Sequence, residues 1–189
     1  MNSSGTRQYR MGARAAAAAD THRRIVAAMG ELAIERFLDD ITLDDVAERA
    51  GVTTRTVIRR FGGREGLVRA AVDAANADVQ VRRDETPEGD MADAVEAVFD
   101  DYERYGDALM MMLAQERRHP ELLSPLADEG RELHRRWIER VFAPRDELQA
   151  AQLVAATDVY VWKLLRRDLG LSRARAKEAM AQMVERLVE

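Results

Sequence analysis

The segment 42–61 constrains the fold of this chain more than any other part of the sequence. Thr42 is a good N-cap for a first helix, because its hydroxyl can accept a hydrogen bond from the first helical turn. Gly51 can end that helix in a left-handed conformation, and Thr53 can cap a second helix that fills the rest of the segment. The segment therefore predicts two short helices joined by a tight turn.

The side chains of this segment fit a helix-turn-helix, in which two helices cross at a steep angle. The crossing needs a small residue on the first helix, a left-handed residue in the turn and an apolar anchor on the second helix. Ala47, Gly51 and Val57 meet these needs in that order. The opposite side of the second helix carries Arg55 and Arg59, and arginine can fork onto guanine edges in the major groove of DNA. The pattern thus predicts a DNA-reading helix.

The rest of the sequence also favours helices. Alanine, leucine, glutamate and arginine dominate, and no window shows the apolar–polar alternation that is typical of strands. We therefore predict an all-α fold, with an N-terminal three-helix domain followed by a C-terminal helical bundle and about nine helices in total. The predicted helices cover residues 21–38, 43–50, 54–61, 64–83, 91–105, 107–117, 124–142, 146–169 and 172–188.

Turn and loop signals divide the chain into three parts. Residues 1–20 are predicted to be a flexible N-terminal arm, disordered at its beginning. Residues 21–84 form the predicted DNA-binding domain, which includes the connecting helix 64–83. The stretch 84–90 contains a proline and a glycine and marks the predicted boundary before the C-terminal domain, residues 91–189.

The charge of the chain is unevenly distributed. Residues 1–66 hold 11 arginines against 9 acidic residues, whereas residues 67–189 hold 18 basic against 25 acidic residues. This asymmetry favours a nucleic-acid face on an acidic body. The absence of cysteine excludes disulfides and cysteine zinc sites and fits a reducing compartment. Without a membrane span or a signal peptide in the sequence, we expect a soluble cytoplasmic protein with no membrane partner.

A wider pattern surrounds the helix-turn-helix. Its core reads Val-Ala-x-x-Ala-Gly-Val, and Phe-Gly-Gly-Arg-Glu-Gly-Leu follows at residues 61–67. Over residues 21–72 the chain closely resembles the TetR family of bacterial repressors. The resemblance implies an all-helical homodimer that binds a palindromic double-stranded operator and releases it when a small effector binds the body. The predicted DNA-binding residues are Thr42, Thr53, Thr54, Arg55, Thr56, Arg59, Arg60 and Arg64.

Two positions differ from the family pattern. Arg64 stands where a phosphate-binding lysine is usual, so the charge is kept while its geometry changes. Ile58 stands where the family commonly has a tyrosine, so the hydroxyl contact of that tyrosine cannot be transferred. We expect Ile58 to pack in the small core of the domain, with contact to a thymine methyl as the alternative.

The C-terminal body carries methionine and aromatic side chains that could line an effector cavity or simply fill the core. Methionine adapts to varied ligand shapes, and few charges match a strongly ionic ligand, so we predict a mostly apolar small-molecule effector. His134 is expected to be exposed or to cap a helix. The candidate ligand-binding residues are Phe99, Tyr102, Met110, Met111, His134, Trp137, Tyr160 and Trp162.

The predicted helices 146–169 and 172–188 have apolar residues on more than one face, which permits the four-helix dimer interface expected from the family. Other functions are an activator in place of a repressor, a helical scaffold that binds no DNA, and an enzyme. The enzyme is disfavoured because a di-metal bundle needs repeated Glu-x-x-His pairs on facing helices, whereas only Glu116 and His119 have this spacing here, and no phosphate loop or nucleophile elbow is present. We predict neither a catalytic residue, a metal nor a cofactor.

Overall fold

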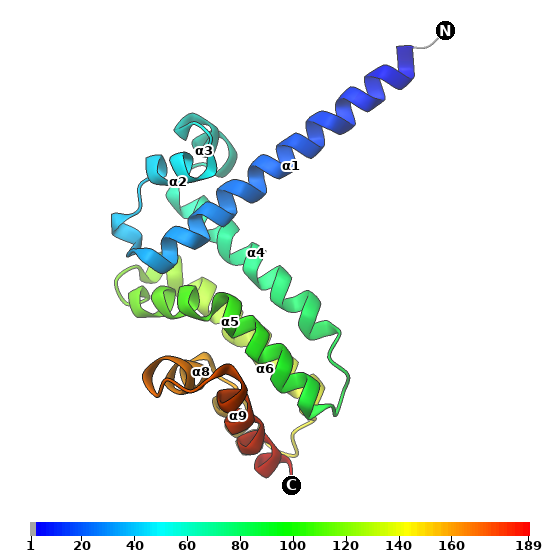
Figure 1. Ribbon diagram of the computed structural model, residues 1–189, viewed down its shortest axis with the longest axis vertical. Helices are drawn as coiled ribbons and strands as arrows, with labels where there is room; N and C mark the ends of the chain where they lie inside the picture. Colours follow the sequence, from blue (N-terminus) through cyan, green and yellow to red (C-terminus); the bar gives the residue numbers. More distant parts are fainter. Residues whose placement is uncertain (1–2) are drawn as a thin grey trace. The chain divides into compact units, whose positions relative to one another are not determined.

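The computed structural model describes residues 3–189, with the side chains of residues 12 and 14–189 (Figure 1). Over residues 3–189 the chain forms nine α-helices, one 3-10 turn and one π-helical segment, without any strand. The prediction of an all-α fold is therefore confirmed. The helices gather into two compact units, residues 1–74 and residues 75–189, and each is described by itself.

The first unit contains α1 (Ser3–Glu35), a 3-10 turn (Leu38–Asp40), α2 (Leu43–Ala50), α3 (Thr54–Phe61) and the beginning of α4 (Arg64–Asp84). The first helix begins at Ser3, well before the predicted residue 21. The run of alanines at 15–19 has high helix propensity and allows the helix to continue through the predicted arm. The start of that arm, residues 1–2, lies outside the described residues, and the flexibility of the arm stays a prediction.

A small apolar core holds the first unit together. Its largest fully buried side chains include Ile25 and Leu32 from α1, Val46 from α2 and Val57 from α3. Leu38 is also buried, because the chain leaves α1 at Glu35 and turns this side chain inward through the 3-10 segment. The first helix therefore ends three residues before the predicted end.

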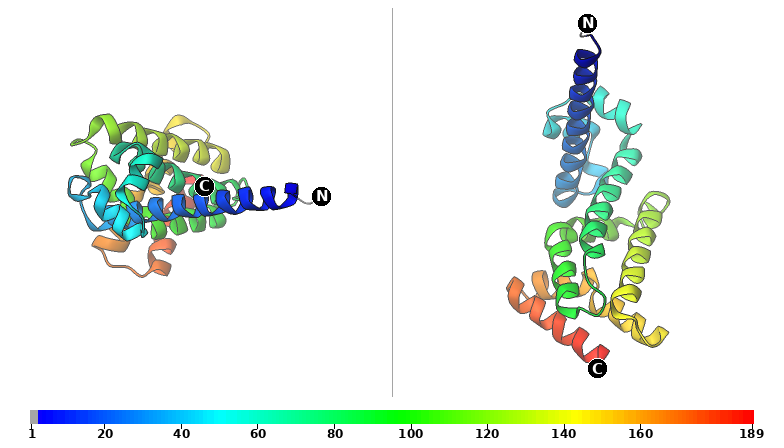
Figure 2. Two further views of the ribbon diagram at one scale, coloured as in Figure 1. Left: turned by 90° about the horizontal axis from the view of Figure 1, so that it is seen from above. Right: turned by 90° about the vertical axis from the view of Figure 1, so that its right-hand side faces the viewer.

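The second unit contains the remainder of α4, α5 (Met91–Gln115), α6 (Pro120–Phe142), α7 (Glu147–Ala156), α8 (Val159–Lys163), the π-helical segment (Leu164–Asp168) and α9 (Arg173–Val188). Helices α5 and α6 pack against each other (Figure 2). The core of this unit is a single cluster of buried residues: Ala94, Val95, Val98, Phe99, Tyr102, Trp137, Ile138, Val141, Leu153, Ala156, Val159, Trp162, Leu165, Ala176, Met180 and Val184.

The boundary between the units falls inside α4, before the predicted loop 84–90. The last turns of α4 are bonded to the second unit, since Arg82 and Arg83 both contact Asp101 of α5. The connecting helix thus begins in one unit and ends in the other.

Helix α5 is continuous, so the predicted break near residue 106 is wrong. Gly106 is buried within the helix, and a Cβ at this position would lie only 2.5 Å from the Trp162 ring. The glycine leaves room for the indole and does not end the helix. Because Trp162 is distant in sequence, no local signal distinguishes the two roles.

Helix α6 begins at Pro120, and the predicted start with Ser124 as its cap is wrong. Pro120 occupies the first turn, where its missing N–H leaves no hydrogen bond unmade. Pro125 lies inside the same helix, where it lacks the N–H for an intrahelical hydrogen bond. A proline in the first turn does mark the start of this helix, but the proline is Pro120 and not Pro125.

The predicted single helix 146–169 is broken at Thr157 and Asp158. The hydroxyl of Thr157 donates to the Leu153 carbonyl, and Asp158 caps α8 by accepting from the Tyr160 N–H. The predicted cap at Ser172 is confirmed, because its hydroxyl accepts from the Arg175 N–H at the start of α9. The predicted total of about nine helices agrees with the structure for a coincidental reason. Two predicted helices, 91–105 and 107–117, are the single helix α5, and one predicted helix, 146–169, is divided into α7 and α8.

Candidate nucleic-acid interface and ligand cavity

The helix-turn-helix forms from local signals. Thr42 and Asp45 make reciprocal hydrogen bonds at the start of α2: the Asp45 N–H donates to the Thr42 hydroxyl at 3.1 Å, and the Thr42 N–H donates to the Asp45 carboxylate at 2.8 Å. Gly51 ends the helix with φ of 64°, a left-handed conformation that favours glycine. Val52 then donates its N–H to the Ala47 carbonyl at 2.9 Å, which closes the turn before α3.

The exposed face of α3 carries Arg55 and Arg59, one helical turn apart. No carboxylate within the described side chains lies within 4 Å of either guanidinium, so both cations are available to a partner. Ile58 lies on the same side and is 48% exposed. The expectation that Ile58 packs in the core is therefore wrong, because Val57 occupies the inward-facing position and is fully buried.

The threonine hydroxyls of this region are partly used within the chain. The Thr53 hydroxyl accepts from the Thr56 N–H at 3.3 Å and lies 3.0 Å from the Thr56 hydroxyl, so it caps α3 as predicted. The Thr54 hydroxyl donates to the carboxylate of Asp44. The Thr42 hydroxyl donates to Asp45 at 2.6 Å, while the residue itself stays exposed. Each of these hydroxyls can still accept a hydrogen bond from a partner. Within the chain, however, they already help to hold α2 and α3 in place.

The two remaining predicted residues differ from the exposed pair. Arg60 is half-buried, and its Nε is buried with no hydrogen-bond partner among the described residues. Arg64 is half-buried and opens α4. A Cβ at Gly66 would lie 2.0 Å from the carbonyl oxygen of Phe61, so the first turn of α4 passes too close to α3 for any side chain at that position. This contact explains physically why glycine stands there in the motif 61–67.

Two arginines that the sequence did not single out hold α2 against α1. The Arg24 guanidinium donates to the Ala50 carbonyl at 2.6 Å, where a cation is favoured by the C-terminal end of the helix. Arg49 makes two hydrogen bonds to Glu35 at 2.8 and 2.9 Å. The side-chain hydrogen bond from Arg49 lowers the pKa of Glu35. Both contacts are long-range, and neither follows a spacing that sequence reasoning could have recognised.

The predicted ligand-binding residues are mostly core residues of the second unit. Phe99 and Trp162 are fully buried in the hydrophobic cluster, while Met110 is partly buried against it. Tyr102 is also buried and donates its hydroxyl to the Thr157 carbonyl at 3.1 Å. Tyr160 is 56% exposed, so the structure does not bring it together with the others. Met111 is half-buried.

His134 is buried, and the expectation of an exposed or capping histidine is wrong. The Thr157 hydroxyl donates to a backbone carbonyl, so toward His134 Nε2, 3.0 Å away, it can only accept. Nε2 therefore carries the proton, and Nδ1 accepts from Arg83 Nη1 at 2.8 Å. The imidazole is neutral, because burial and the neighbouring Arg83 charge lower its pKa to about 3.

The His134 site is part of a polar cluster that joins three helices. Asp101 is 1% exposed and accepts from both Arg82 and Arg83, with 2.8 Å between its Oδ2 and Arg83 Nε. The Arg83 guanidinium also lies over the Trp137 ring, 4.9 Å from its centroid. The Trp137 indole donates to the Arg83 carbonyl at 3.3 Å. The end of α4 is thus fixed to α5 and α6 by these hydrogen bonds, and Asp78 is a second carboxylate partner of Arg82.

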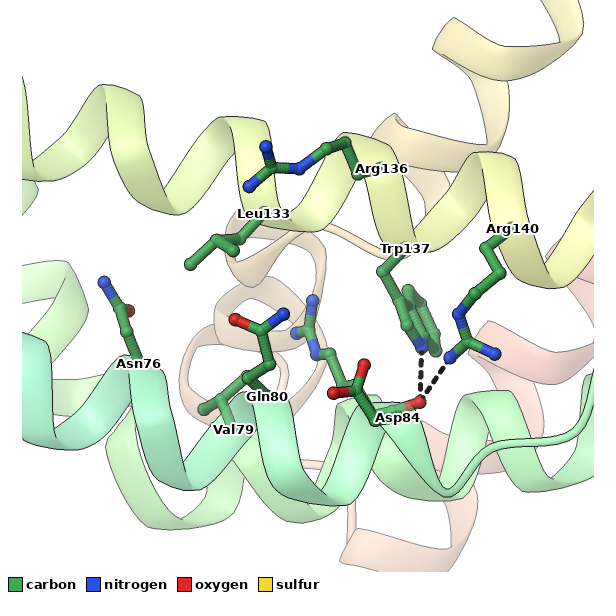
Figure 3. A pocket seen from close by; sticks show the side chains of 9 residues that line it. Asn76, Val79, Gln80, Asp84, Leu133, Arg136, Trp137 and Arg140 are labelled. Atoms are coloured by element: carbon green, nitrogen blue, oxygen red, sulfur yellow. Dashed lines mark hydrogen bonds between the residues drawn. The ribbon is translucent and has the colours of Figure 1, made fainter.

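The second unit also contains a cavity of about 180 Å³ between the end of α4 and α6 (Figure 3). Its lining residues are Asn76, Val79, Gln80, Arg83, Asp84, Leu133, Arg136, Trp137 and Arg140. Of the eight predicted ligand-binding residues, only Trp137 lines it. A second hollow of about 620 Å³ lies between residues 87–92 and α9, with Glu88, Asp90 and Glu185 in its wall.

Comparison with known proteins agrees with the geometry of the first unit. Residues 25–71 match the family described as "Bacterial regulatory proteins, tetR family". No curated protein sequence matches this chain. Within the described part of the chain, no helix is both long and apolar enough to cross a membrane.

Several solved structures share the fold. A transcriptional regulator from Rhodococcus sp. Rha1 is 19% identical, with a TM-score of 0.70 over 88% of this chain and 95% of that one. A tetR-family transcriptional regulator from Streptomyces coelicolor is 19% identical, with a TM-score of 0.68 over 88% of this chain and 78% of that one. The multidrug binding protein EbrR, complexed with imidazole, is 20% identical, with a TM-score of 0.57 over 85% of this chain and 88% of that one.

The fold and the site together define a two-unit, all-α protein with an N-terminal helix-turn-helix. Residues 25–71 match the TetR family model, and the chain shares its fold with solved TetR-type transcriptional regulators. The resemblance that the sequence indicated is confirmed.

Proposed function

We propose that this chain is a ligand-responsive repressor that binds a palindromic operator as a homodimer. The observation that carries the proposal is the exposed face of α3, where Arg55 and Arg59 lie one turn apart with no carboxylate partner within the described side chains. A helix of this kind fits the major groove, where arginine donates to the O6 and N7 atoms of guanine. Ile58, between the two arginines, adds an apolar group that suits a thymine methyl.

Different residues are proposed to position the protein on DNA and to read the base sequence. Arg64 opens α4, and the N-terminal end of α3 favours a bound phosphate through its helix dipole. Contacts to phosphate fix the register of the protein on the duplex but carry no sequence information. We therefore assign base reading to Arg55 and Arg59, and phosphate binding to Arg64 and to the helix termini.

The dimer is supported by apolar side chains exposed near the end of the chain. Leu148, Tyr160, Leu164, Leu169 and Met183 are between 37% and 69% exposed; four of them lie on α7, α8, the π-helical segment or α9, and Leu169 directly follows the π-helical segment. Leucine side chains exposed in this way are typical of a surface that a second copy covers. A twofold dimer would present two reading helices to the two halves of a palindrome.

The oligomeric state tests this interface. Sedimentation at micromolar concentration should give about twice the chain mass. Leu164→Glu should shift the protein to a monomer, because an isologous contact would bury the charge in both copies. Val81→Glu is the matched control, since Val81 is 63% exposed on α4, outside the proposed interface. A monomeric wild-type protein would contradict the proposed dimer.

A small-molecule effector is expected to bind the second unit and weaken operator binding. The solved relative described as a multidrug binding protein supports this role for the fold. By linkage, the effector must bind the DNA-incompetent state more tightly than the competent one, and a coupling of about 1–3 kcal/mol changes operator affinity about 5- to 150-fold. Because Phe99 and Trp162 are packed in the core, the effector site is better sought at a cavity than among those residues.

Selection of bound duplexes from a random DNA pool tests the proposed function directly. The account predicts recovery of an inverted repeat whose half-sites are about one helical turn apart, or a small multiple of that distance. A reporter gene behind the recovered sequence would then separate repression from activation. Failure to enrich any sequence would contradict operator binding.

A further inference from the structure

The beginning of α1 stands apart from the core of the first unit. Among residues 12 and 14–20, all are exposed except Ala18, which is half-buried, and a Cβ at Gly12 would meet no atom within 4 Å. The first buried side chain of α1 among those described is Ile25. Figure 1 shows this part of the helix projecting beyond the other helices of the unit. Residues 3–20 are called the α1 extension below.

The α1 extension is cationic. The sequence places three arginines in it, Arg7, Arg10 and Arg14, and no acidic residue before its last position. That last residue, Asp20, is already paired with Arg23 at 3.1 Å and with Arg24 at 3.3 Å. Arg14 is exposed, and no carboxylate of the described side chains lies within 4 Å of it. The positive charge of the extension is therefore left for a partner outside the chain.

The spacing of the three arginines suits a row of anions. Positions 7, 10 and 14 follow each other at intervals of three and four residues, so they share one side of a helix. The helix rises about 10 Å from position 7 to position 14, at about 1.5 Å for each residue. Phosphates follow each other at about 3.4 Å along a DNA strand, so the row matches about three phosphate intervals.

The composition of the extension disfavours an apolar partner. A helix that docks into a protein groove or lies in a membrane interface needs an apolar stripe. The large apolar residues of the extension are Tyr9 and Met11, and a spacing of two residues does not place them on one stripe. A polyanion is therefore favoured over a partner helix or a lipid surface.

The extension begins beside the DNA-facing helix. The His22 ring of α1 lies 4.9 Å from the ring of Phe61, which is the last residue of α3. Arg59, on the exposed face of α3, comes two residues before Phe61. From this point an extension of 18 residues rises about 27 Å, which corresponds to about eight phosphates along one strand. A duplex in contact with α3 is thus within reach of the extension.

We propose that the α1 extension binds the phosphate backbone of DNA beside the segment that α3 reads, through Arg7, Arg10 and Arg14. The inference rests on the proposed function, because α3 has to dock on a duplex before the extension can follow it. These contacts add affinity without sequence information, since phosphates are the same along any duplex. The extension therefore lengthens the protein–DNA interface beyond the helix-turn-helix.

The salt dependence of binding to a random duplex tests the phosphate contacts. The full chain is compared with a combined variant, Arg7→Gln, Arg10→Gln and Arg14→Gln, in which glutamine keeps a high helix propensity. Each lost phosphate contact lowers the slope of the logarithm of the binding constant against the logarithm of salt concentration by about 0.9. The combined variant should therefore lose about two to three units of slope for each bound protomer, and Arg14→Gln alone about one unit.

A second variant controls for net charge. Arg135→Gln, Arg136→Gln and Arg175→Gln together remove three charges from exposed side chains of the second unit. This control should keep the wild-type slope. The combined extension variant should also unfold in urea as the wild type does, because the described part of the extension packs against no buried side chain.

The proposal is overturned if the combined variant keeps the wild-type slope, or if the control lowers the slope by as much. Vesicles that contain phosphatidylserine are a second probe. If the wild type binds them, the combined variant does not, and the DNA slope is unchanged, the extension belongs to a membrane surface and the proposal fails. A chain that enriches no operator would contradict the proposed function, while the slope on random DNA still decides the role of the extension.

Discussion

Replacement of His134 by glutamine should change how stability depends on pH. In the folded protein the pKa of His134 is lowered to about 3 by burial and by Arg83, whereas in the unfolded chain it has its usual value of about 6.5. Because the folded-state pKa is the lower one, the unfolded chain takes up the proton first as the pH falls. The wild type therefore loses stability below pH 6.5, by about 1.4 kcal/mol for each pH unit.

The magnitude follows from this window. Between pH 7 and pH 5 the His134 contribution falls by about 2 kcal/mol, while His134→Gln has no titrating group there. At pH 7 the variant should be less stable by about 1–3 kcal/mol, because glutamine lacks the imidazole ring that stacks on Trp137 and does not hold its two polar groups in the fixed geometry of that ring. The stability gap between the two proteins should thus narrow by about 2 kcal/mol on going to pH 5.

Urea unfolding of both proteins at pH 7, 6 and 5 measures this gap. His22→Gln serves as the matched control for loss of a histidine, since His22 is exposed on α1. If the curves of wild type and His134→Gln remain parallel from pH 7 to pH 5, His134 is not the buried neutral group that the hydrogen bonds indicate.

Further predictions concern packing and the DNA-facing helix. Gly106→Ala should destabilise the protein by about 1–3 kcal/mol in thermal or urea unfolding, because the new methyl would overlap the Trp162 ring. Gly130→Ala, with open space at its Cβ, should instead stabilise α6 by up to about 1 kcal/mol, and equal effects of the two would refute the packing argument. Ile58→Ala should change the free energy of unfolding by less than about 0.5 kcal/mol while weakening operator binding, as measured by fluorescence anisotropy. An Ile58→Ala protein that unfolds much more easily would show a core role instead.

Local signals allowed the helix-turn-helix to be predicted closely. The caps at Thr42 and Thr53 and the left-handed turn at Gly51 each act through neighbours within a few residues, and all three are confirmed. The exposed face of α3 was predicted equally well from the spacing of its arginines. Ile58 was misplaced, because a small helix needs only one strongly buried side chain and Val57 already provides it.

Long-range contacts explain what could not be predicted in the second unit. Gly106 continues a helix because of Trp162, and His134 is buried because Arg83 and Thr157 satisfy both of its nitrogens. The cavity was missed for the same reason, since much of its wall comes from the end of α4, which the sequence assigned to the connecting helix. The aromatic residues that looked available for a ligand are mostly used to fill the core.

The central claim is that α3 reads DNA bases through Arg55 and Arg59. The measurement is the affinity of Arg55→Ala, Arg59→Ala and Arg64→Ala for a selected operator and for a random duplex of equal length, over a series of salt concentrations. Arg175→Ala is the control, because Arg175 is exposed on α9.

The account predicts that Arg55→Ala and Arg59→Ala lose about 5- to 150-fold in affinity for the operator and much less for random DNA. Arg64→Ala should weaken binding to both duplexes alike and reduce the salt dependence by about one unit. Equal losses on both duplexes for all three variants, or no loss for Arg55→Ala and Arg59→Ala, would contradict base reading by α3.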